Sequence, residues 1–280
     1  MEKVWEWPIR LFKKSVLKQQ KYTEITNLLG ATEGLRCLDI GSDNGVISYL
    51  LRQRGGKWKS ADLDYRSIEA MRELVETDVY QIDGGRTPFE TDEFDCVVIV
   101  DFLEHISDDS GFMKEIFRIL KPGGVLILNA PNLKLGWLMR FRQAIGLTEE
   151  AHGHLRPGYD LNSIQELVGN DFSLDNFKTY TKFPSKFMDT LMVLGLSLLK
   201  KDKGKHTSGR GILVTGKDLG NYRAMFAFYT LIYPLVWVFS RMDHILFTQS
   251  GYMLIARARS NKKQVEIDHQ VALQVSQPQV

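Results

Sequence analysis

Residues 35–45 read Leu-Arg-Cys-Leu-Asp-Ile-Gly-Ser-Asp-Asn-Gly. The first half of this stretch is a short apolar run, which is typical of a buried strand, and the second half is a glycine-rich loop. Residues 46–54, which follow, have the periodicity of a helix. Gly41 and Gly45 can adopt positive φ and let backbone amides approach a ligand closely. This order predicts the opening strand–loop–helix unit of a parallel α/β sheet, with a ligand at the loop.

The same alternation continues outward from this stretch to about residue 130. We expect further strands at 57–63, 79–82, 94–100 and 125–129, and helices at 67–75 and 112–120. Residues 94–100 are rich in β-branched side chains, as in a strand buried on both faces. The alternation therefore predicts an α/β fold with right-handed βαβ units and a doubly wound, mostly parallel sheet that has helices on both faces.

Composition divides the chain into four parts. The predicted parts are an amphipathic helical lead-in (1–29), a core (30–182 and 250–259), an apolar and basic helical insertion before the last strand (183–249), and a disordered tail (260–280). In the second half of the core we expect a helix at 161–168 and strands at 172–180 and 251–257. The tail is polar and lacks apolar periodicity, which is why we expect it to be disordered.

The overall charge and the cysteines limit the partners and the compartment. A formal net charge of +2 over 280 residues gives no global reason to expect nucleic-acid binding. Cys37 and Cys96 both lie in apolar runs, so we expect two reduced core residues rather than a disulfide. The N-terminus has no signal-peptide pattern, and the expected location is cytoplasmic.

Acidic residues follow two further predicted strands. Asp62 and Asp64 end the strand at 57–63, and Asp83 follows the strand at 79–82. The carboxyl ends of parallel strands meet at one edge of a sheet, so these acids should lie near the glycine loop. There, Asp62 or Asp64 could accept hydrogen bonds from two ribose hydroxyls, and Asp83 could accept one from an exocyclic amine. Each acid taken alone is more simply a solvated loop residue.

The loop does not fit a dinucleotide. A G-x-G-x-x-G fingerprint that starts at Gly41 requires glycine at two later positions, which are occupied by Asp43 and Val46. A pyrophosphate would also be repelled by the acids of the loop, whereas a ligand that carries an amine and a sulfonium would not. An oxidoreductase is therefore disfavoured.

With these motifs in order, residues 30–135 resemble the class I S-adenosyl-L-methionine (SAM)-dependent methyltransferases. The matching segments are 37–45, 61–64, 83–95, 101–105 and 119–124. The resemblance implies a Rossmann-like seven-stranded sheet and SAM as the methyl donor. It also implies a cofactor site formed by Asp39, Gly41, Asp43, Gly45, Asp62, Asp83 and Asp101. Asp43 departs from the glycine usual in the family, but aspartate tolerates left-handed backbone better than most residues.

The chemistry of methyl transfer narrows the catalytic candidates. The methyl group of SAM is already activated, so a general base is needed only when the acceptor must lose a proton. His105 follows the strand at 94–100 and is the candidate base, with Glu104 and a later histidine, His154, as further candidates. The alternative is that Glu104 and His105 only order the loop.

A metal site is a second alternative. Asp101, Glu104 and His105, with His152 and His154 downstream, are similar to the E-x-x-E-H pattern of some metal-dependent O-methyltransferases. A divalent cation held there could acidify a hydroxyl acceptor. The Glu-His pair is also common in relatives that use no metal, and we predict no metal.

The insertion combines apolar and basic segments. Residues 224–240 contain no charge, although this length is short for a spanning helix, which needs about 20 residues, and Pro234 interrupts it. Residues 190–199 form a second apolar stretch, and residues 200–223 carry seven bases against two acids. This pattern predicts a patch on an anionic membrane surface, peripheral at the inner membrane face, or a cap over the active site; both can hold.

These observations predict O-methylation of a small, lipid or lipid-linked glycan acceptor. The alternatives are methylation of protein or nucleic acid, and a non-catalytic module that retains the SAM fold. Nucleic acid is disfavoured because the basic segment is interleaved with aliphatic rather than aromatic residues. The oligomeric state is left open.

Overall fold

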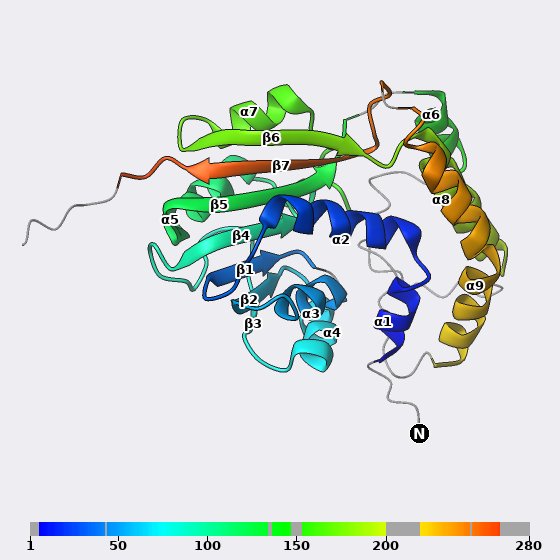
Figure 1. Cartoon of the computed structure of the whole chain (residues 1–280), viewed down its shortest axis with the longest axis horizontal. Coiled ribbons are helices and arrows are strands. Elements are labelled where there is room, and N and C mark those ends of the chain that lie inside the picture. The colour runs from blue at the N-terminus through cyan, green and yellow to red at the C-terminus, as the bar shows by residue number, and fades with distance from the viewer. Residues whose placement is uncertain are drawn as a thin grey trace, which may run out of the picture.

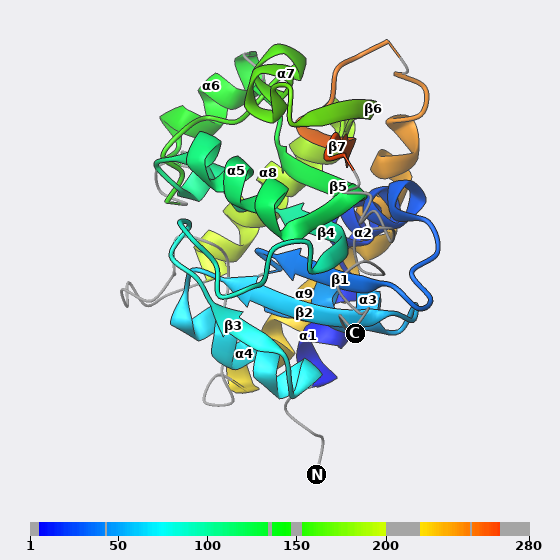
Figure 2. The same cartoon turned by 90° about the vertical axis from the view of Figure 1, so that its left-hand side faces the viewer.

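The computed structural model describes residues 6–42, 44–133, 136–146, 153–199, 219–246 and 248–263. Its centre is a seven-stranded sheet with the order β3-β2-β1-β4-β5-β7-β6 (Figures 1 and 2). The strands are β1 (Arg36–Ile40), β2 (Lys57–Asp62), β3 (Val79–Gln81), β4 (Phe94–Val100), β5 (Leu120–Pro131), β6 (Phe172–Tyr180) and β7 (Met253–Ser260). Strands β1 to β5 are parallel, and β7 runs antiparallel between β5 and β6. The predicted Rossmann-like, mostly parallel seven-stranded α/β fold is confirmed.

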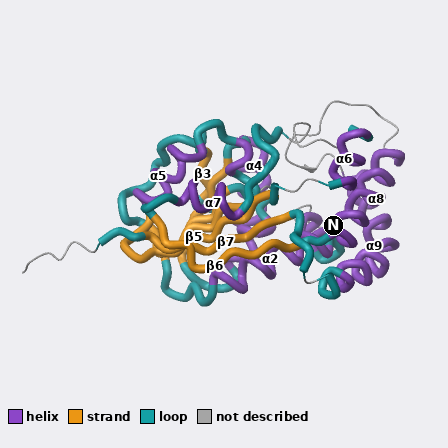
Figure 3. The backbone as a smooth tube through the Cα atoms, turned by 90° about the horizontal axis from the view of Figure 1, so that it is seen from above, coloured by secondary structure: helices purple, strands orange, loops and turns teal. Residues whose placement is uncertain are grey.

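Helices cover both faces of this sheet (Figure 3). The helices are α1 (Glu6–Phe12), α2 (Val16–Leu29), α3 (Val46–Arg52), α4 (Tyr65–Val75), α5 (Asp109–Ile119), α6 (Trp137–Ala144), α7 (Leu161–Val168), α8 (Phe183–Leu199) and α9 (Leu219–Met242), with a 3-10 turn, η1, at Leu103–His105. Apolar side chains of α5 and α7 pack on one face, and those of α2 and α3 pack on the other.

The central strands bury apolar side chains on both faces of the sheet. Leu38 and Ile40 of β1 face α5 and α7, whereas Cys37 faces α2 and α3. Cys37 pairs in register with Cys96 of β4, and both are free, buried cysteines. Burial raises the pKa of Cys37 to about 12, with further contributions from Asp95 and Asp39. The two cysteines are therefore inert core residues, as the sequence indicates.

The N-terminal lead-in consists of two helices, because the chain turns between Phe12 and Val16. Helix α1 leaves the sheet and packs against α9, where the rings of Trp7 and Phe226 meet edge to face at 5.8 Å. Of the predicted disordered tail (260–280), the structure describes residues 260–263: β7 continues to Ser260, and Lys262 donates to the carbonyl oxygens of Arg118 and Leu120 at 2.8 and 2.6 Å. The rest of the predicted tail lies outside the described residues.

Helices α1, α6, α8 and α9 gather beyond the carboxyl ends of the parallel strands (Figure 1), and we call them the cap. Arg142 of α6 is buried and binds Thr190 of α8 at 2.8 Å. The carboxylate of Asp243, just after α9, accepts from the backbone N–H of Lys182 and Ser185 at the start of α8. Helix α8 of the insertion is thus connected both to α6 and to the segment that follows α9. Within the described residues, no helix has both the length and the apolar character needed to cross a membrane.

Candidate functional site

The glycine-rich loop packs directly on its neighbours. Gly41 has a φ of 84°, and a Cβ there would overlap the carbonyl oxygen of Val100 and lie 2.9 Å from Cβ of Phe102. Gly45 has a φ of 76°, and a Cβ there would lie 2.8 Å from Cα of Met71. Both glycines are therefore required by packing as well as by backbone conformation. The loop is held tightly between the end of β4 and α4.

Asp39, near the end of β1, holds this loop through hydrogen bonds. Its Oδ1 accepts hydrogen bonds from the hydroxyls of Ser42 and Ser48 at 2.7 and 2.5 Å, and its Oδ2 accepts from Ser60 at 2.7 Å. Arg52 lies 3.6 Å from Oδ2, and the side chain of Asp39 is fully buried. Both carboxylate oxygens thus have partners within the loop and its flanks. The prediction that Asp39 contacts the cofactor stays a prediction, whereas its contacts in the structure order the loop.

The acids after β2 have different positions. Asp62 is 1% exposed, and its Oδ1 accepts the backbone N–H of Asp64 at 3.1 Å. Asp64 is the N-cap of α4 and accepts the backbone N–H of Arg66. Asp64 is therefore a helix cap. Asp62 remains the residue of the pair that could bind a ribose.

Asp83 lies at the mouth of a cavity. The cavity has a volume of about 730 Å³ and is lined in part by Leu63, Asp83, His105, Phe112 and Leu155. The exposed Asp83 accepts the backbone N–H of Gly85 at 2.8 Å. The cavity thus joins the acid after β3 to the histidine after β4, whereas Gly41, Gly45, Asp62 and Asp101 are not among its lining residues.

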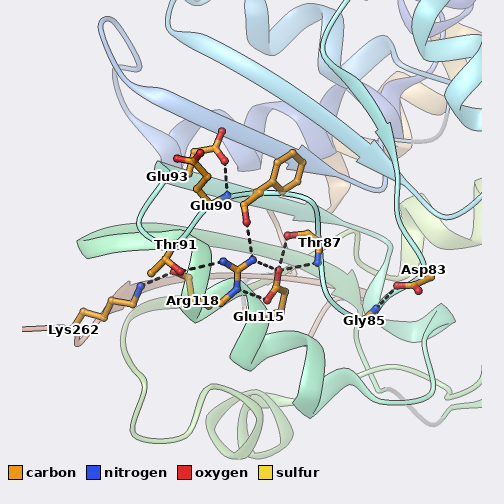
Figure 4. Close-up of polar contacts among 10 residues, drawn as sticks. Asp83, Gly85, Thr87, Glu90, Thr91, Glu93, Glu115, Arg118 and Lys262 are labelled. Atoms are coloured by element: carbon orange, nitrogen blue, oxygen red, sulfur yellow. Dashed lines mark hydrogen bonds and ion pairs between the residues drawn. The ribbon is translucent and has the colours of Figure 1, made fainter.

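A partly buried ion pair anchors the loop that carries Asp83 (Figure 4). Glu115 of α5 accepts from the backbone N–H and the hydroxyl of Thr87 at 2.8 and 2.5 Å, and from Arg118 at 2.6 Å. Arg118 also donates to the carbonyl oxygen of Phe89 at 2.8 Å. Burial alone would raise the pKa of Glu115, but hydrogen bonds from Arg118 and Thr87 hold it below its ordinary value. The pair between Glu115 and Arg118 was not predicted from the sequence, although two opposite charges three residues apart on a helix favour an ion pair.

Asp101 follows β4 and has a φ of 44°. Its carboxylate forms an ion pair with Lys21 of α2, 80 residues earlier in the chain. Asp101 follows Val100, whose carbonyl oxygen lies directly against Gly41 of the glycine loop. Asp101 is therefore next to this loop. A lysine of the N-terminal lead-in therefore reaches the predicted cofactor site, which no local motif indicated.

Glu104, His105 and His154 come together despite their separation in sequence. Each offers a potential ligand atom, and these atoms all lie within 4.8 Å of one another. Glu104 is fully buried, and the rings of His105 and His154 meet edge to face at 4.8 Å. The structure thus brings together the three predicted catalytic residues. Their catalytic role stays a prediction.

Contacts between two loops hold this cluster. The backbone N–H of Leu155 donates to the carbonyl oxygen of Glu104 at 2.7 Å. Arg156 forms an ion pair with Asp109 and donates to the carbonyl oxygen of Ile106 at 2.9 Å. Since a carbonyl oxygen only accepts, the 3.0 Å contact between His105 Nδ1 and the carbonyl of Gly153 assigns a proton to Nδ1. In the neutral ring, Nε2 then carries the lone pair that a base requires.

The cluster also has a donor set that could hold a metal ion. Two imidazoles and one carboxylate suit a borderline ion such as Zn²⁺ or Fe²⁺ better than Mg²⁺, which prefers oxygen ligands. Asp101 does not belong to this group. His152 of the metal alternative, and Asp43 of the predicted cofactor loop, lie outside the described residues.

Comparisons with known proteins bear on the core of the chain. A family model described as a methyltransferase domain matches residues 38–128. A demethylmenaquinone methyltransferase of Tropheryma whipplei is 28% identical over 104 residues, which are 36% of this chain and 44% of that protein. A ubiquinone biosynthesis O-methyltransferase of Cereibacter sphaeroides is 31% identical over 105 residues, which are 36% of this chain and 42% of that protein. The matches thus span less than half the length of these relatives.

Solved structures extend the likeness to most of the chain at the level of the fold. The cyclase SpnF has a TM-score of 0.57 at 15% identity, covering 87% of this chain and 80% of that chain. A SAM-dependent methyltransferase of Mesorhizobium loti has a TM-score of 0.50 at 13% identity, covering 91% and 98%. The methyl donor of the matched family is SAM, as the glycine loop and the strand-end acids predict. The chain therefore contains a class I SAM-dependent methyltransferase domain, whose matched part is residues 38–128.

Proposed function

We propose that this chain transfers the methyl group of SAM to a hydroxyl of a small, lipid-associated acceptor, with His105 as the general base. One observation carries the proposal: Asp83 and His105 line the same cavity. Asp83 stands where the cofactor's adenine would be recognised, and His105 stands where an acceptor hydroxyl would meet the methyl group. SAM held at the glycine loop would have to extend into this cavity to contact Asp83, since Gly41, Gly45, Asp62 and Asp101 are not among the lining residues.

The reaction is a direct displacement. The acceptor oxygen forms a bond to the methyl carbon, the carbon–sulfur bond breaks, and the sulfonium becomes a neutral thioether. The proton of the hydroxyl passes to Nε2 of His105, while Nδ1 stays bonded to Gly153. Glu104 and His154 fix the ring, and Glu104 stabilises its positive charge, because a buried carboxylate favours an imidazolium nearby.

The predicted cofactor residues would have different roles in the site. Gly41 and Gly45 shape the loop, and the start of α3 offers a positive dipole end to the SAM carboxylate. Asp62 binds the ribose, Asp83 binds the adenine amine, and Asp101 interacts with the cationic amine or sulfonium. We infer that Asp39 orders the loop, because its oxygens are already bonded to three serines.

The acceptor class rests on two features. The relatives named above are a demethylmenaquinone methyltransferase and a ubiquinone biosynthesis O-methyltransferase; both names favour a quinone-type lipid, and the second favours an oxygen acceptor. The cap also places apolar helices beyond the carboxyl edge of the sheet (Figure 1), where an acceptor with a hydrocarbon tail would lie. A lipid-linked glycan is the second acceptor class that fits this cap.

Comparison of lipid and glycan extracts from cells with and without the gene tests this proposal. The expected product is heavier than its precursor by one methylene and is absent without the gene. A strain that carries only His105→Gln should accumulate the precursor. Identical extracts from the two strains would contradict the proposal and favour a non-catalytic module.

A metal-assisted reaction is the second candidate, because Glu104, His105 and His154 could ligate one ion. Dialysis against EDTA separates the two mechanisms. The general-base mechanism predicts unchanged activity after the treatment, whereas loss of activity that Zn²⁺ or Fe²⁺ restores would favour the metal.

A further inference from the structure

The outer face of α9 is apolar and exposed. Five large apolar residues of α9 and one in the turn that follows it are exposed: Leu231, Leu235, Trp237, Val238, Met242 and Ile245. Leu231 is 79% exposed and Ile245 is 73% exposed. We call these six residues the α9 face. Contiguous apolar surfaces of this kind mark interaction sites more often than chance exposure.

The opposite side of α9 is already engaged in the protein. Val236 is 3% exposed, and Phe226 packs on Trp7 of α1. Helix α8 runs alongside α9 (Figures 1 and 3), with Phe228 against Gly195. The α9 face is therefore the exposed side of the helix that remains after α1 and α8 have packed.

The charges within α9 have one sign, and the described acid nearest to it in sequence, Asp243 just after the helix, is buried and accepts hydrogen bonds from the backbone N–H of Lys182 and Ser185. The 24 residues of α9 contain no Asp or Glu, and its charged residues are Arg223 and Arg241. Arg241 lies over the ring of Trp237 at 4.8 Å, so the cation is held beside the apolar face. On the α1 side, Lys14 lies over the ring of Tyr233 at 5.3 Å. The linking segment 200–218 adds six bases against two acids to the sequence between α8 and α9.

We infer that the α9 face docks the protein on an anionic phospholipid bilayer. Aliphatic side chains would enter the boundary between headgroups and acyl chains, Trp237 would lie at headgroup depth, and Arg223 and Arg241 would contact lipid phosphates. A second copy of the chain fits less well, because two α9 faces would bring arginines together with no carboxylate on either helix. Docking is independent of methyl transfer, although it would place the cap against the source of a lipid acceptor.

Flotation of the purified full-length chain with vesicles tests this inference. The protein should float with vesicles of phosphatidylcholine and phosphatidylglycerol but not with pure phosphatidylcholine. The double variant Leu231→Glu/Leu235→Glu should weaken binding by at least about tenfold, because it places two charges in the interface. Arg223→Gln and Arg241→Gln should each weaken binding about fivefold.

The matched control is Leu161→Glu, at an exposed leucine of α7 that is 40% exposed and lies away from α9 (Figure 1). This variant should float as the wild type does. Equal binding to both vesicle types, no binding to either, or an equal loss in the Leu161→Glu variant would overturn the inference. So would concentration-dependent dimerisation that the Leu231→Glu/Leu235→Glu variant abolishes. SAM titration of the same variants keeps failure of docking separate from failure of the proposed function.

Discussion

Nδ1 of His105 lies 3.0 Å from the carbonyl oxygen of Gly153, which joins the end of β4 to a loop 48 residues later. This contact sets the tautomer of the proposed base and turns the ring against His154. The ion pair between Arg156 and Asp109 joins the same later loop to the start of α5. The proposed chemistry therefore rests on tertiary contacts as much as on the residues after β4.

Replacing His105 by glutamine should remove the base and leave the cofactor site intact. We expect kcat to fall by about 10²- to 10⁴-fold, while the Kd for SAM measured by calorimetry changes by less than about twofold. His154→Gln should have a smaller effect, because His154 acts through His105. An unchanged kcat in the His105→Gln variant would assign His105 to loop order alone.

Asp62 and Asp64 form a matched pair for the cofactor site. Asp62→Asn should weaken SAM binding by about tenfold to a hundredfold, since a charge-assisted hydrogen bond contributes about 1.5–3 kcal/mol. Asp64→Asn should leave SAM binding unchanged, because Asp64 caps α4. Calorimetric titration of both variants measures the difference, and equal affinities would remove Asp62 from the cofactor site.

Gly41 can be tested against Gly34, which shares its positive φ without its crowding. Gly34 has a φ of 74°, and a Cβ added there would have no neighbour within 4 Å, so Gly34→Ala should cost only about 1–2 kcal/mol of stability. Gly41→Ala should cost more and should also weaken SAM binding, because the loop must move away from Val100. Thermal unfolding of both variants gives the comparison; equal losses would show that the loop tolerates a side chain.

Glu115 should contribute stability in a pH-dependent way. Its folded pKa lies below the ordinary 4.5, so its contribution is full above that value and is lost as the pH falls through the folded pKa. Glu115→Gln should lower the free energy of unfolding by about 1–3 kcal/mol near neutral pH. The difference from wild type should shrink as the pH falls below 4.5. A difference that stays constant with pH would mean that the charge of Glu115 contributes nothing.

The parts of the fold that the sequence predicts are those with a local pattern. The β-branched run of β4 and the apolar strand before Gly41 indicate buried parallel strands, and both positions agree with the structure. Helix α6 has no such signal, since only Leu138 and Arg142 of its residues are buried. The division of the predicted helical lead-in into two helices was not predicted, because its apolar spacing runs through the turn before Val16.

The positions of Asp62 and Asp83 at the ends of β2 and β3 were predictable, because each follows a local apolar pattern, while their roles in cofactor binding stay predictions. The site was not predictable where distant segments meet. Lys21 reaches Asp101 only because α2 packs on the sheet, and Trp7 reaches Phe226 only because α1 leaves it. The partners of Asp39 were hidden for another reason: the serines that bond it are common residues with no pattern of their own.

Label transfer from SAM tests methyl transfer itself. Purified protein is incubated with SAM carrying a deuterated methyl group and a lipid extract from cells that lack the gene, and the lipids are analysed by mass spectrometry. We predict that one lipid class gains the deuterated methyl group with the wild-type protein and not with His105→Gln. Absence of label in every lipid, with SAM bound as shown by calorimetry, would contradict the proposed reaction.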